Sequence, residues 1–142
     1  MPGPAPQRLR QLIDTLITIR RRQAAEDPEL FAAYRTLAMD AKSVVAAHID
    51  ELIALIATII RSGVDEGSFR AVDPAAAGRA MLFATFRFHH PAHAAEWADP
   101  MIDAEYNNVW QLLMDGLCVA NATGQKNTEE KKRMENPPDS SQ

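Results

Sequence analysis

The amino-acid sequence predicts an all-α protein, and three observations support this fold class. Apolar residues recur at three- and four-residue spacings along most of the first 120 residues, as they do on one face of a helix. No segment sustains the alternation of apolar and polar residues that a half-buried strand shows. Aromatic residues make up only 6% of the chain, and its 142 residues suffice for one core without disulfides. We therefore expect one bundle of about five or six helices.

The first predicted helix covers residues 8–25 and is amphipathic. Its apolar side chains fall on one stripe, made by Leu9, Leu12, Ile13, Leu16 and Ile17. Residues 1–7 hold three prolines and one glycine, and we expect them to form a flexible N-terminus. The helical domain then covers residues 8–120.

A long helical pattern follows and begins at Asp27-Pro28-Glu29. An aspartate accepts a hydrogen bond from a free N–H of the first turn, and proline lacks the N–H that would stay unpaired there. A glutamate suits the positive end of the helix dipole. No proline or glycine occurs from residue 29 to residue 62. Because such a run exceeds ordinary globular helices, it fits either one very long helix or two helices with a kink near residues 39–43.

The third pattern is a helix over residues 75–90 that is apolar on nearly every side. Gly67 precedes it and can adopt the positive φ that ends a helix. Asp73 and Pro74 then supply the cap and the first residue of the new helix. A helix that is apolar all round is buried on most sides. We expect it to stop before Pro91.

The last predicted helix covers residues 102–119, after a connector over residues 91–100 with at most one short turn. Asp99 and Asp103 compete as its cap. Its apolar stripe is formed by Ile102, Tyr106, Val109, Trp110, Leu113 and Leu117. Residues 121–142 are polar and low in apolar content, so we expect a disordered C-terminal tail there.

Charge is distributed unevenly along the chain. Residues 1–25 carry +4, from five arginines and one aspartate, whereas residues 26–121 carry −8, from six basic and fourteen acidic side chains. Nucleic acid would be repelled by this acidic body, and only the N-terminal arginines could approach it. They are Arg8, Arg10, Arg20, Arg21 and Arg22. A solvated helix face explains them equally well, and we expect no sequence-specific DNA binding by this chain.

Other features favour a cytoplasmic protein. The longest apolar run, residues 53–60, is far too short to cross a membrane. The N-terminal residues include arginines but no apolar segment of the kind a signal peptide needs. Cys118 is the one cysteine, so no intramolecular disulfide can form, as is usual in a reducing compartment.

The sequence offers little for catalysis, metals or cofactors. It contains none of the nucleophile-elbow, phosphate-loop, dithiol or zinc-protease motifs, so we expect no enzyme and no catalytic residues. His89, His90, His93 and Glu96 could in principle hold zinc. Pro91 interrupts the helix between them, so His89 and His93 are not one turn apart on one face. The preferred interpretation is therefore no metal and no cofactor, with His89 and His90 at a helix C-terminus or at the mouth of a pocket.

Three stretches carry a family resemblance: DPELFAAYRTL, VDEGSFRAVDP and RFHHPAHAAEW. Together they resemble the C-terminal half of tetracycline-repressor-like (TetR) transcription regulators, and the resemblance spans residues 8–119. It implies a helical domain that binds an effector and dimerises. In this family the DNA-reading helix-turn-helix lies in a separate N-terminal unit, which we do not find in this sequence. Residues 8–25 resemble the helix that links the two halves.

The resemblance implies an effector cleft among the helices. Such clefts are apolar with few polar anchors. The expected wall consists of Leu16, Phe31, Tyr34, Ile53, Phe83, Phe86 and His89. Tyr34 or His89 would be the polar anchor for an apolar or aromatic small molecule. The alternative is ordinary core packing, which large apolar residues at helical spacing commonly indicate.

The resemblance also implies a homodimer, in which the last two long helices of each protomer form a four-helix bundle. The matching segments are residues 75–90 and 102–119. The expected interface consists of Leu82, Tyr106, Val109, Trp110, Leu113 and Leu117. Gly116 would allow close approach of a partner helix. The alternative is that Trp110 fills the core of a single chain.

Two functions remain open after this reading. The first is the ligand-sensing and dimerisation domain of a TetR-like regulator. The second is a ligand-free helical interaction module that pairs with itself or with related regulators. A cavity among the wall residues would favour the first, and close packing of the same residues would favour the second.

Overall fold

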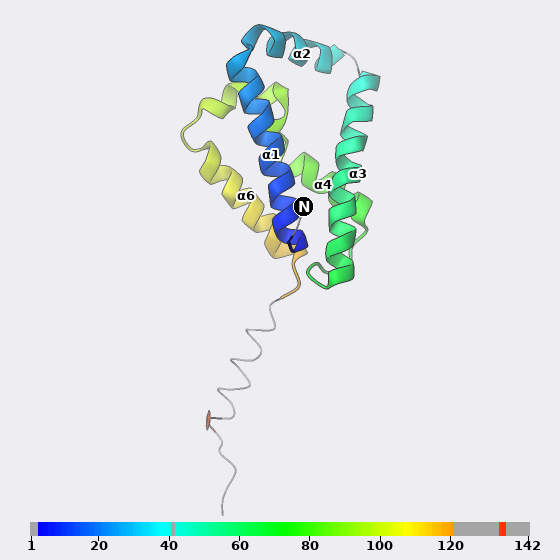
Figure 1. Ribbon diagram of the computed structural model, residues 1–142. Coiled ribbons are helices and arrows are strands. Elements are labelled where there is room, and N and C mark those ends of the chain that lie inside the picture. Colours follow the sequence, from blue (N-terminus) through cyan, green and yellow to red (C-terminus); the bar gives the residue numbers. More distant parts are fainter. Residues whose placement is uncertain (1–2, 41, 121–133, 136–142) are drawn as a thin grey trace, which may run out of the picture.

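The structure is a computed structural model that describes residues 3–40, 42–120 and 134–135. Within these residues the chain forms six α-helices and one 3₁₀ helix, and no strand (Figure 1). The elements are α1 (Ala5–Glu26), α2 (Pro28–Asp40), α3 (Lys42–Glu66), α4 (Pro74–Ala84), α5 (Phe86–His89), η1 (Pro91–Ala98) and α6 (Ile102–Leu117). The all-α prediction is confirmed. The predicted disordered tail, residues 121–142, lies outside the described residues apart from 134–135.

Helix α1 runs through the middle of the molecule, with α3 on one side and α6 on the other (Figure 1). Its buried stripe includes Leu9 and Ile13, both 0% exposed. The helix begins at Ala5, so the flexible N-terminus predicted for residues 1–7 is too long. Ala5 is also fully buried, and its N–H donates to Glu66 Oε2 at 3.3 Å. The early start follows from Pro6, because proline fits the first turn of a helix.

The long helical pattern is divided into two helices. Helix α2 ends at Asp40 and α3 begins at Lys42, so the break falls within the range predicted from the sequence. In Figure 1 α2 lies across the upper ends of α1 and α3. Asp27 separates α1 from α2, and its Oδ1 accepts from the Leu30 N–H at 3.0 Å, as the predicted cap requires. The two helix breaks place α2 over the region between α1 and α3.

The turn after α3 confirms the predicted stop and start signals. Gly67 has φ 82°. The N–H of Ser68 donates to the Gly63 carbonyl at 2.9 Å and that of Gly67 to Val64 at 3.1 Å, which is a Schellman motif. Asp73 then caps α4 by accepting from the Ala76 N–H at 3.2 Å.

The predicted helix over residues 75–90 is wrong in one respect, because it is interrupted at Thr85. The Thr85 hydroxyl donates to the carbonyl of Met81 at 3.0 Å, and α4 ends at Ala84, the residue before Thr85. A threonine hydroxyl bonded back to the preceding turn bends a helix. The short helix α5 then turns His89 and Phe88 into the core, where they are 3% and 2% exposed.

The connector before the last helix is more regular than predicted. Residues 91–98 form the 3₁₀ helix η1 rather than a loop with one turn. Helix α6 ends at Leu117, two residues before its predicted end. Neither Asp99 nor Asp103 caps α6, because its N-cap is Met101 without a side-chain cap bond, and Asp99 Oδ1 instead accepts from the Met101 N–H at 2.9 Å in the preceding turn. Within the described part of the chain, no helix has the length and apolar character to cross a membrane.

Candidate functional site

The predicted wall residues are spread over α1, α2, α3, α4 and α5, and differ in exposure. Phe31 and His89 are buried, Leu16, Ile53 and Phe86 are half-buried, and Tyr34 and Phe83 are 37% and 42% exposed. The structure brings Phe83, Phe86 and His89 together, with ring centroids 4.6 Å apart for the phenylalanines and 5.6 Å apart for Phe86 and His89. Phe31 instead packs on Trp97 of η1, at 5.8 Å. The aromatic residues therefore form two groups rather than one wall.

A cleft of about 320 Å³ lies between the end of α1 and α2. It contains two of the predicted wall residues, Phe31 and Tyr34, together with the exposed Leu30. The remaining lining residues are Arg20, Gln23, Glu26 and Asp27. The volume lies at the lower end of the range typical of small-molecule sites. An apolar floor with a few polar groups is the composition that such sites share.

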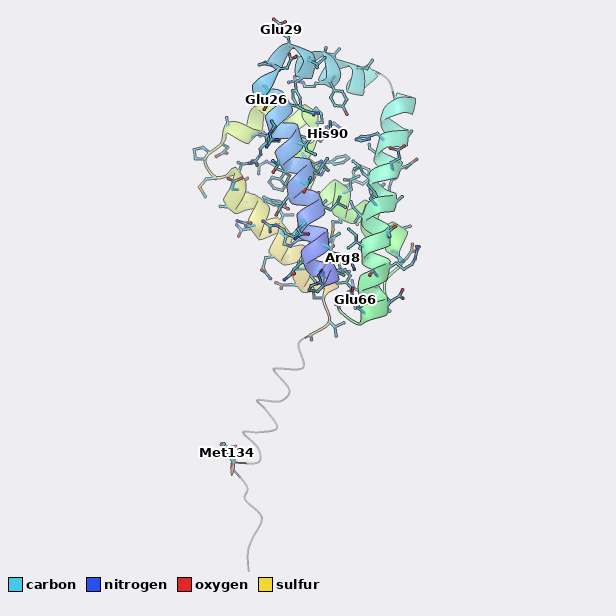
Figure 2. The ribbon with its side chains drawn as sticks, in the orientation of Figure 1. Arg8, Glu26, Glu29, Glu66, His90 and Met134 are labelled. Carbon is cyan, nitrogen blue, oxygen red and sulfur yellow. The ribbon has the colours of Figure 1, made fainter. Side chains whose placement is uncertain are left out.

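Two polar residues that the sequence interpretation did not assign to a site, Arg20 and His48, lie beside this cleft. Arg20 Nη2 lies 3.0 Å from His48 Nε2, so a side chain of α1 reaches α3. The Arg20 guanidinium also lies 5.1 Å from the centroid of the Tyr34 ring on α2. In Figure 2 His90 projects into the region between α1 and α3, below α2. We call Arg20, Tyr34, His48 and His90 the Arg20 cluster.

A signal for two of these residues was present in the sequence. Arg20 follows Ile17 by three residues and Leu16 by four, so it continues the inward stripe of α1. His48 precedes Leu52 by four residues on the inward stripe of α3. A charged residue that continues an apolar stripe starts from the side of the helix that faces its neighbours. The sequence interpretation grouped Arg20 with the surface arginines and did not use this position.

His89, the expected polar anchor, has a partner inside the chain. Its Nε2 lies 3.0 Å from the Thr85 hydroxyl, and the residue is 3% exposed. Burial lowers the pKa of His89 to about 3, and repulsion by a protonated His90 and by Arg20 acts in the same direction. His89 is therefore neutral at pH 7, and its role as an effector anchor remains a prediction. Tyr34, the other expected anchor, is open to the cleft.

His90 belongs to the Arg20 cluster and directly follows α5, the short helix after the break at Thr85. Its Nδ1 accepts from the Ala92 N–H at 3.1 Å and so caps η1. Its ring lies 4.9 Å from Phe86. Burial lowers the pKa of His90, and the charges of His93 and Arg20 lower it further. The ring is consequently a neutral polar group held next to a permanent cation.

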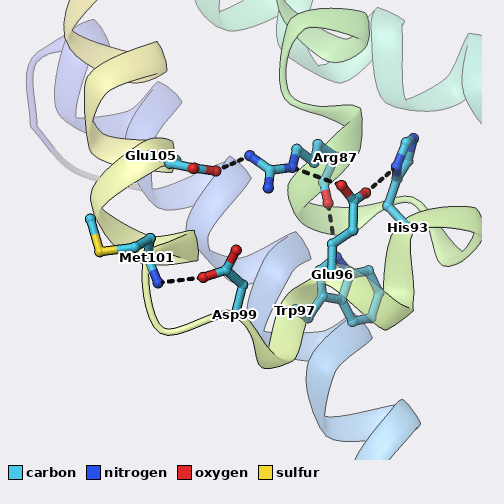
Figure 3. Close-up of polar contacts among 7 residues, drawn as sticks. All are labelled: Arg87, His93, Glu96, Trp97, Asp99, Met101 and Glu105. Carbon is cyan, nitrogen blue, oxygen red and sulfur yellow. Dashed lines mark hydrogen bonds and ion pairs between the residues drawn. The ribbon is translucent and has the colours of Figure 1, made fainter.

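His93, the third histidine considered as a zinc ligand, is hydrogen-bonded to another side chain. His93 Nδ1 lies 2.6 Å from Glu96 Oε2, and Glu96 Oε1 is bonded to Arg87 Nε at 3.1 Å (Figure 3). Arg87 also pairs with Glu105 of α6. The hydrogen bond from His93, followed by the Arg87 contact, lowers the pKa of Glu96. This network joins α5, η1 and α6, and the residues that the structure describes hold no group of three metal-binding side chains.

The predicted dimer residues lie largely inside one chain. Leu82, Tyr106, Trp110 and Leu117 are 0–7% exposed, and Val109 and Leu113 are half-buried. The Tyr106 hydroxyl donates to Asp14 Oδ1 at 2.8 Å, and Arg10 lies 5.4 Å from the Trp110 ring. These contacts attach α6 to α1. They favour the alternative interpretation, in which Trp110 fills the core of a single chain.

A different surface on α4 and α6 is apolar and open. Leu112 is 76% exposed, the most of any large apolar residue from residue 3 to residue 120 whose exposure is described. It borders a groove of about 250 Å³ between the two helices. The groove also holds Val72, Ala77, Ala80, Met81, Leu113, Gly116 and Leu117, and one charged residue, Arg70, whose Nε donates to the Gly116 carbonyl. A Cβ added at Gly116 would meet no atom within 4 Å, so the space beside this glycine is free.

The chain was compared with known protein families, curated proteins and solved structures. The family model of the tetracyclin repressor-like C-terminal domain matches residues 5–110. The chain belongs to this family. No curated protein and no solved structure matches the chain. The TetR resemblance read from the sequence is therefore confirmed, and the chain is of the general class of regulator domains that bind effectors and dimerise.

Four of the five N-terminal arginines are held by acidic side chains of the same chain. The pairs are Arg8 with Glu66 at 3.0 Å, Arg10 with Asp14 at 2.9 Å, Arg21 with Asp103 at 2.9 Å, and Arg22 with Glu26 at 4.0 Å. Figure 2 shows Arg8 and Glu66 where the ends of α1 and α3 meet. The solvated-face interpretation therefore needs refinement, because these arginines largely tie helices together or pair along α1.

Proposed function

We propose that the chain is the ligand-sensing and dimerisation domain of a TetR-like transcriptional regulator that works in the cytoplasm. The observation that carries the proposal is the cleft of about 320 Å³ between α1 and α2, in a member of this family. The chain acts by binding and not by catalysis. We expect no sequence-specific contact of these helices with DNA.

The proposed effector is an apolar or aromatic small molecule. The floor of the cleft is formed by Leu30, Phe31 and Tyr34, of which Leu30 is 66% exposed and gains most from being covered. Burying an apolar side chain of this size contributes roughly 1.5–3 kcal/mol. Phe86, half-buried beside His90, lies outside the residues that line this cleft and remains a proposed part of the effector wall. The other predicted wall residues also remain proposals. They would support the effector cleft through the side chains that they contact, and they are Leu16, Ile53, Phe83 and His89.

The proposed dimer forms through the open face of α4 and α6. Its occupant is a second copy of the chain, because the last two long helices pair in this way in the family. Leu112 and the groove beside Gly116 are the self-complementary features that a two-fold contact needs. The buried residues Trp110 and Tyr106 would then support this face from within rather than touch the partner.

Effector binding and dimerisation would be coupled through the helix break at Thr85. The segment α4–α5 reaches from the dimer face to His90 beside the Arg20 cluster. A ligand that prefers one position of α5 shifts the dimer only by its difference in affinity between the two states. In an intact regulator, that shift would set the spacing of the DNA-binding units.

A thermal-shift screen tests the proposal. A ligand present at 100 times its Kd stabilises the folded state by about 2.7 kcal/mol, which raises the melting temperature. We expect apolar or aromatic compounds to stabilise wild type but not Tyr34→Ala. Leu55→Ala is the matched control, because Leu55 is 54% exposed and lies outside the cleft.

Two outcomes would change the assignment. If hits stabilise Tyr34→Ala and wild type equally, the effector site is not this cleft. If no compound stabilises a chain that is dimeric by light scattering, the ligand-free interaction module becomes the better description.

A further inference from the structure

Arg20 differs from the other arginines of α1 in its partners. Each of the other four has a carboxylate within 4.0 Å. Among the side chains that the structure describes, Arg20 has none, and its bonds go to Gln23 Oε1 at 3.3 Å and His48 Nε2 at 3.0 Å. Neither partner is an anion, because Gln23 is an amide and His48 an imidazole. The charge of Arg20 is therefore not balanced by the groups it touches.

The surroundings make this charge consequential. Arg20 is half-buried and lies 5.1 Å from the Tyr34 ring centroid, at the apolar floor of the cleft. Two imidazoles, His89 and His90, lie close enough for its charge to add to the effect of burial in lowering their pKa values. They stay neutral and leave the guanidinium as the local cation. A guanidinium has five N–H donors, so Arg20 retains donors for a further acceptor.

The acidic residues of the same cleft do not supply the missing charge. Asp27 Oδ1 accepts from the Leu30 N–H at 3.0 Å and so caps α2. Glu26 lies 4.0 Å from Arg22 on the outer face of α1, and both side chains are largely exposed. Both carboxylates that line the cleft with Arg20 therefore have partners other than Arg20.

We propose that the effector is a monoanion, a carboxylate on an aromatic or branched apolar body, with the carboxylate bound by Arg20 and the body against Tyr34 and Phe31. This inference rests on the proposed function and names its ligand class. Arg20 is the one cation among the described residues that line the cleft, which also include Glu26 and Asp27, and this favours a ligand with a single negative charge over a multiply charged phosphate. The planar guanidinium fits a carboxylate through two parallel hydrogen bonds.

Matched pairs of acids and their primary amides test this inference. The probes are cinnamate with cinnamamide, phenylacetate with phenylacetamide, and octanoate with octanamide, measured by calorimetry and thermal shift near neutral pH. Acid and amide have almost the same shape and differ in charge. We expect wild type to bind the better acids at least about tenfold more tightly than their amides, as a charge-assisted hydrogen bond predicts.

Two substitutions and one control locate the effect. Arg20→Gln should remove the preference for acids, and Arg20→Lys should retain part of it, because a lysine keeps the charge without the planar fork. Arg22→Gln removes an arginine of the same helix whose side chain is 67% exposed, and should leave the preference unchanged. Circular dichroism of each variant checks that α1 still folds, and Arg20→Lys carries the test if Arg20→Gln does not fold.

The possible results separate this inference from the proposed function. A preference for acids that survives in Arg20→Gln, or is absent in wild type, would overturn the inference. If the amides and neutral aromatics bind but the acids do not, the effector cleft stands and its anionic ligand is wrong. If no compound of either set binds, both are wrong.

Discussion

The sharpest consequence of the open α4–α6 face concerns Leu112. Burying a whole leucine side chain contributes about 2 kcal/mol. Leu112 is 76% exposed in the single chain, so covering it contributes roughly 1.5 kcal/mol per copy and roughly 3 kcal/mol in a two-fold dimer. Leu112→Asp should therefore weaken dimerisation by about 100-fold or more, since about 1.4 kcal/mol corresponds to a factor of ten. The added carboxylate next to its own copy increases the loss.

Analytical ultracentrifugation over a concentration series measures this change. Leu55→Asp is the control, because it places the same charge at a leucine of α3 that is 54% exposed and lies outside the groove. We expect Leu112→Asp to be monomeric where wild type and Leu55→Asp are dimeric, with unchanged helix content. If Leu112→Asp keeps the wild-type dimer constant, the α4–α6 face is not the interface and the reasoning fails.

Three further predictions concern stability. Gly63→Ala should destabilise the fold by about 1–3 kcal/mol in urea unfolding, because its Cβ would collide with the Phe69 ring. Gly116→Ala, with open space at its Cβ, should stabilise the isolated chain by up to about 1 kcal/mol, and equal effects at the two glycines would refute this packing. His89 has a folded pKa of about 3 and an unfolded value near 6.5, so the unfolded state alone takes up a proton as the pH falls through this window. The free energy of unfolding should fall by about 1.4 kcal/mol per pH unit there, and a His89→Gln variant with the same pH slope would contradict the assignment.

The ends of helices were largely predictable because their causes are local. Gly67 stops α3 and Asp73 starts α4, and each acts through backbone groups within a few residues. The break at Thr85 was missed. Threonine is common in helices, and its hydroxyl interrupts this one in a context where His89 is buried against it. That burial depends on the packing of α5 against other helices, which local sequence does not specify.

The site was predictable only in part, for a related reason. An apolar stripe shows which side of a helix is covered but not what covers it. The positions of Trp110 and Tyr106 in the sequence are therefore compatible with burial by a partner chain or by α1. In the structure α1 covers them. Arg20 shows the opposite error, since charge suggested a surface position although its spacing from Ile17 pointed inward.

We propose above all that an effector binds in the cleft between α1 and α2, and a crystal structure with a stabilising compound tests this most directly. We predict that the compound covers Tyr34 and Leu30 and that its carboxylate lies within hydrogen-bond distance of Arg20. A compound bound only outside this cleft, with Arg20 still on His48 and Tyr34 uncovered, would contradict the account.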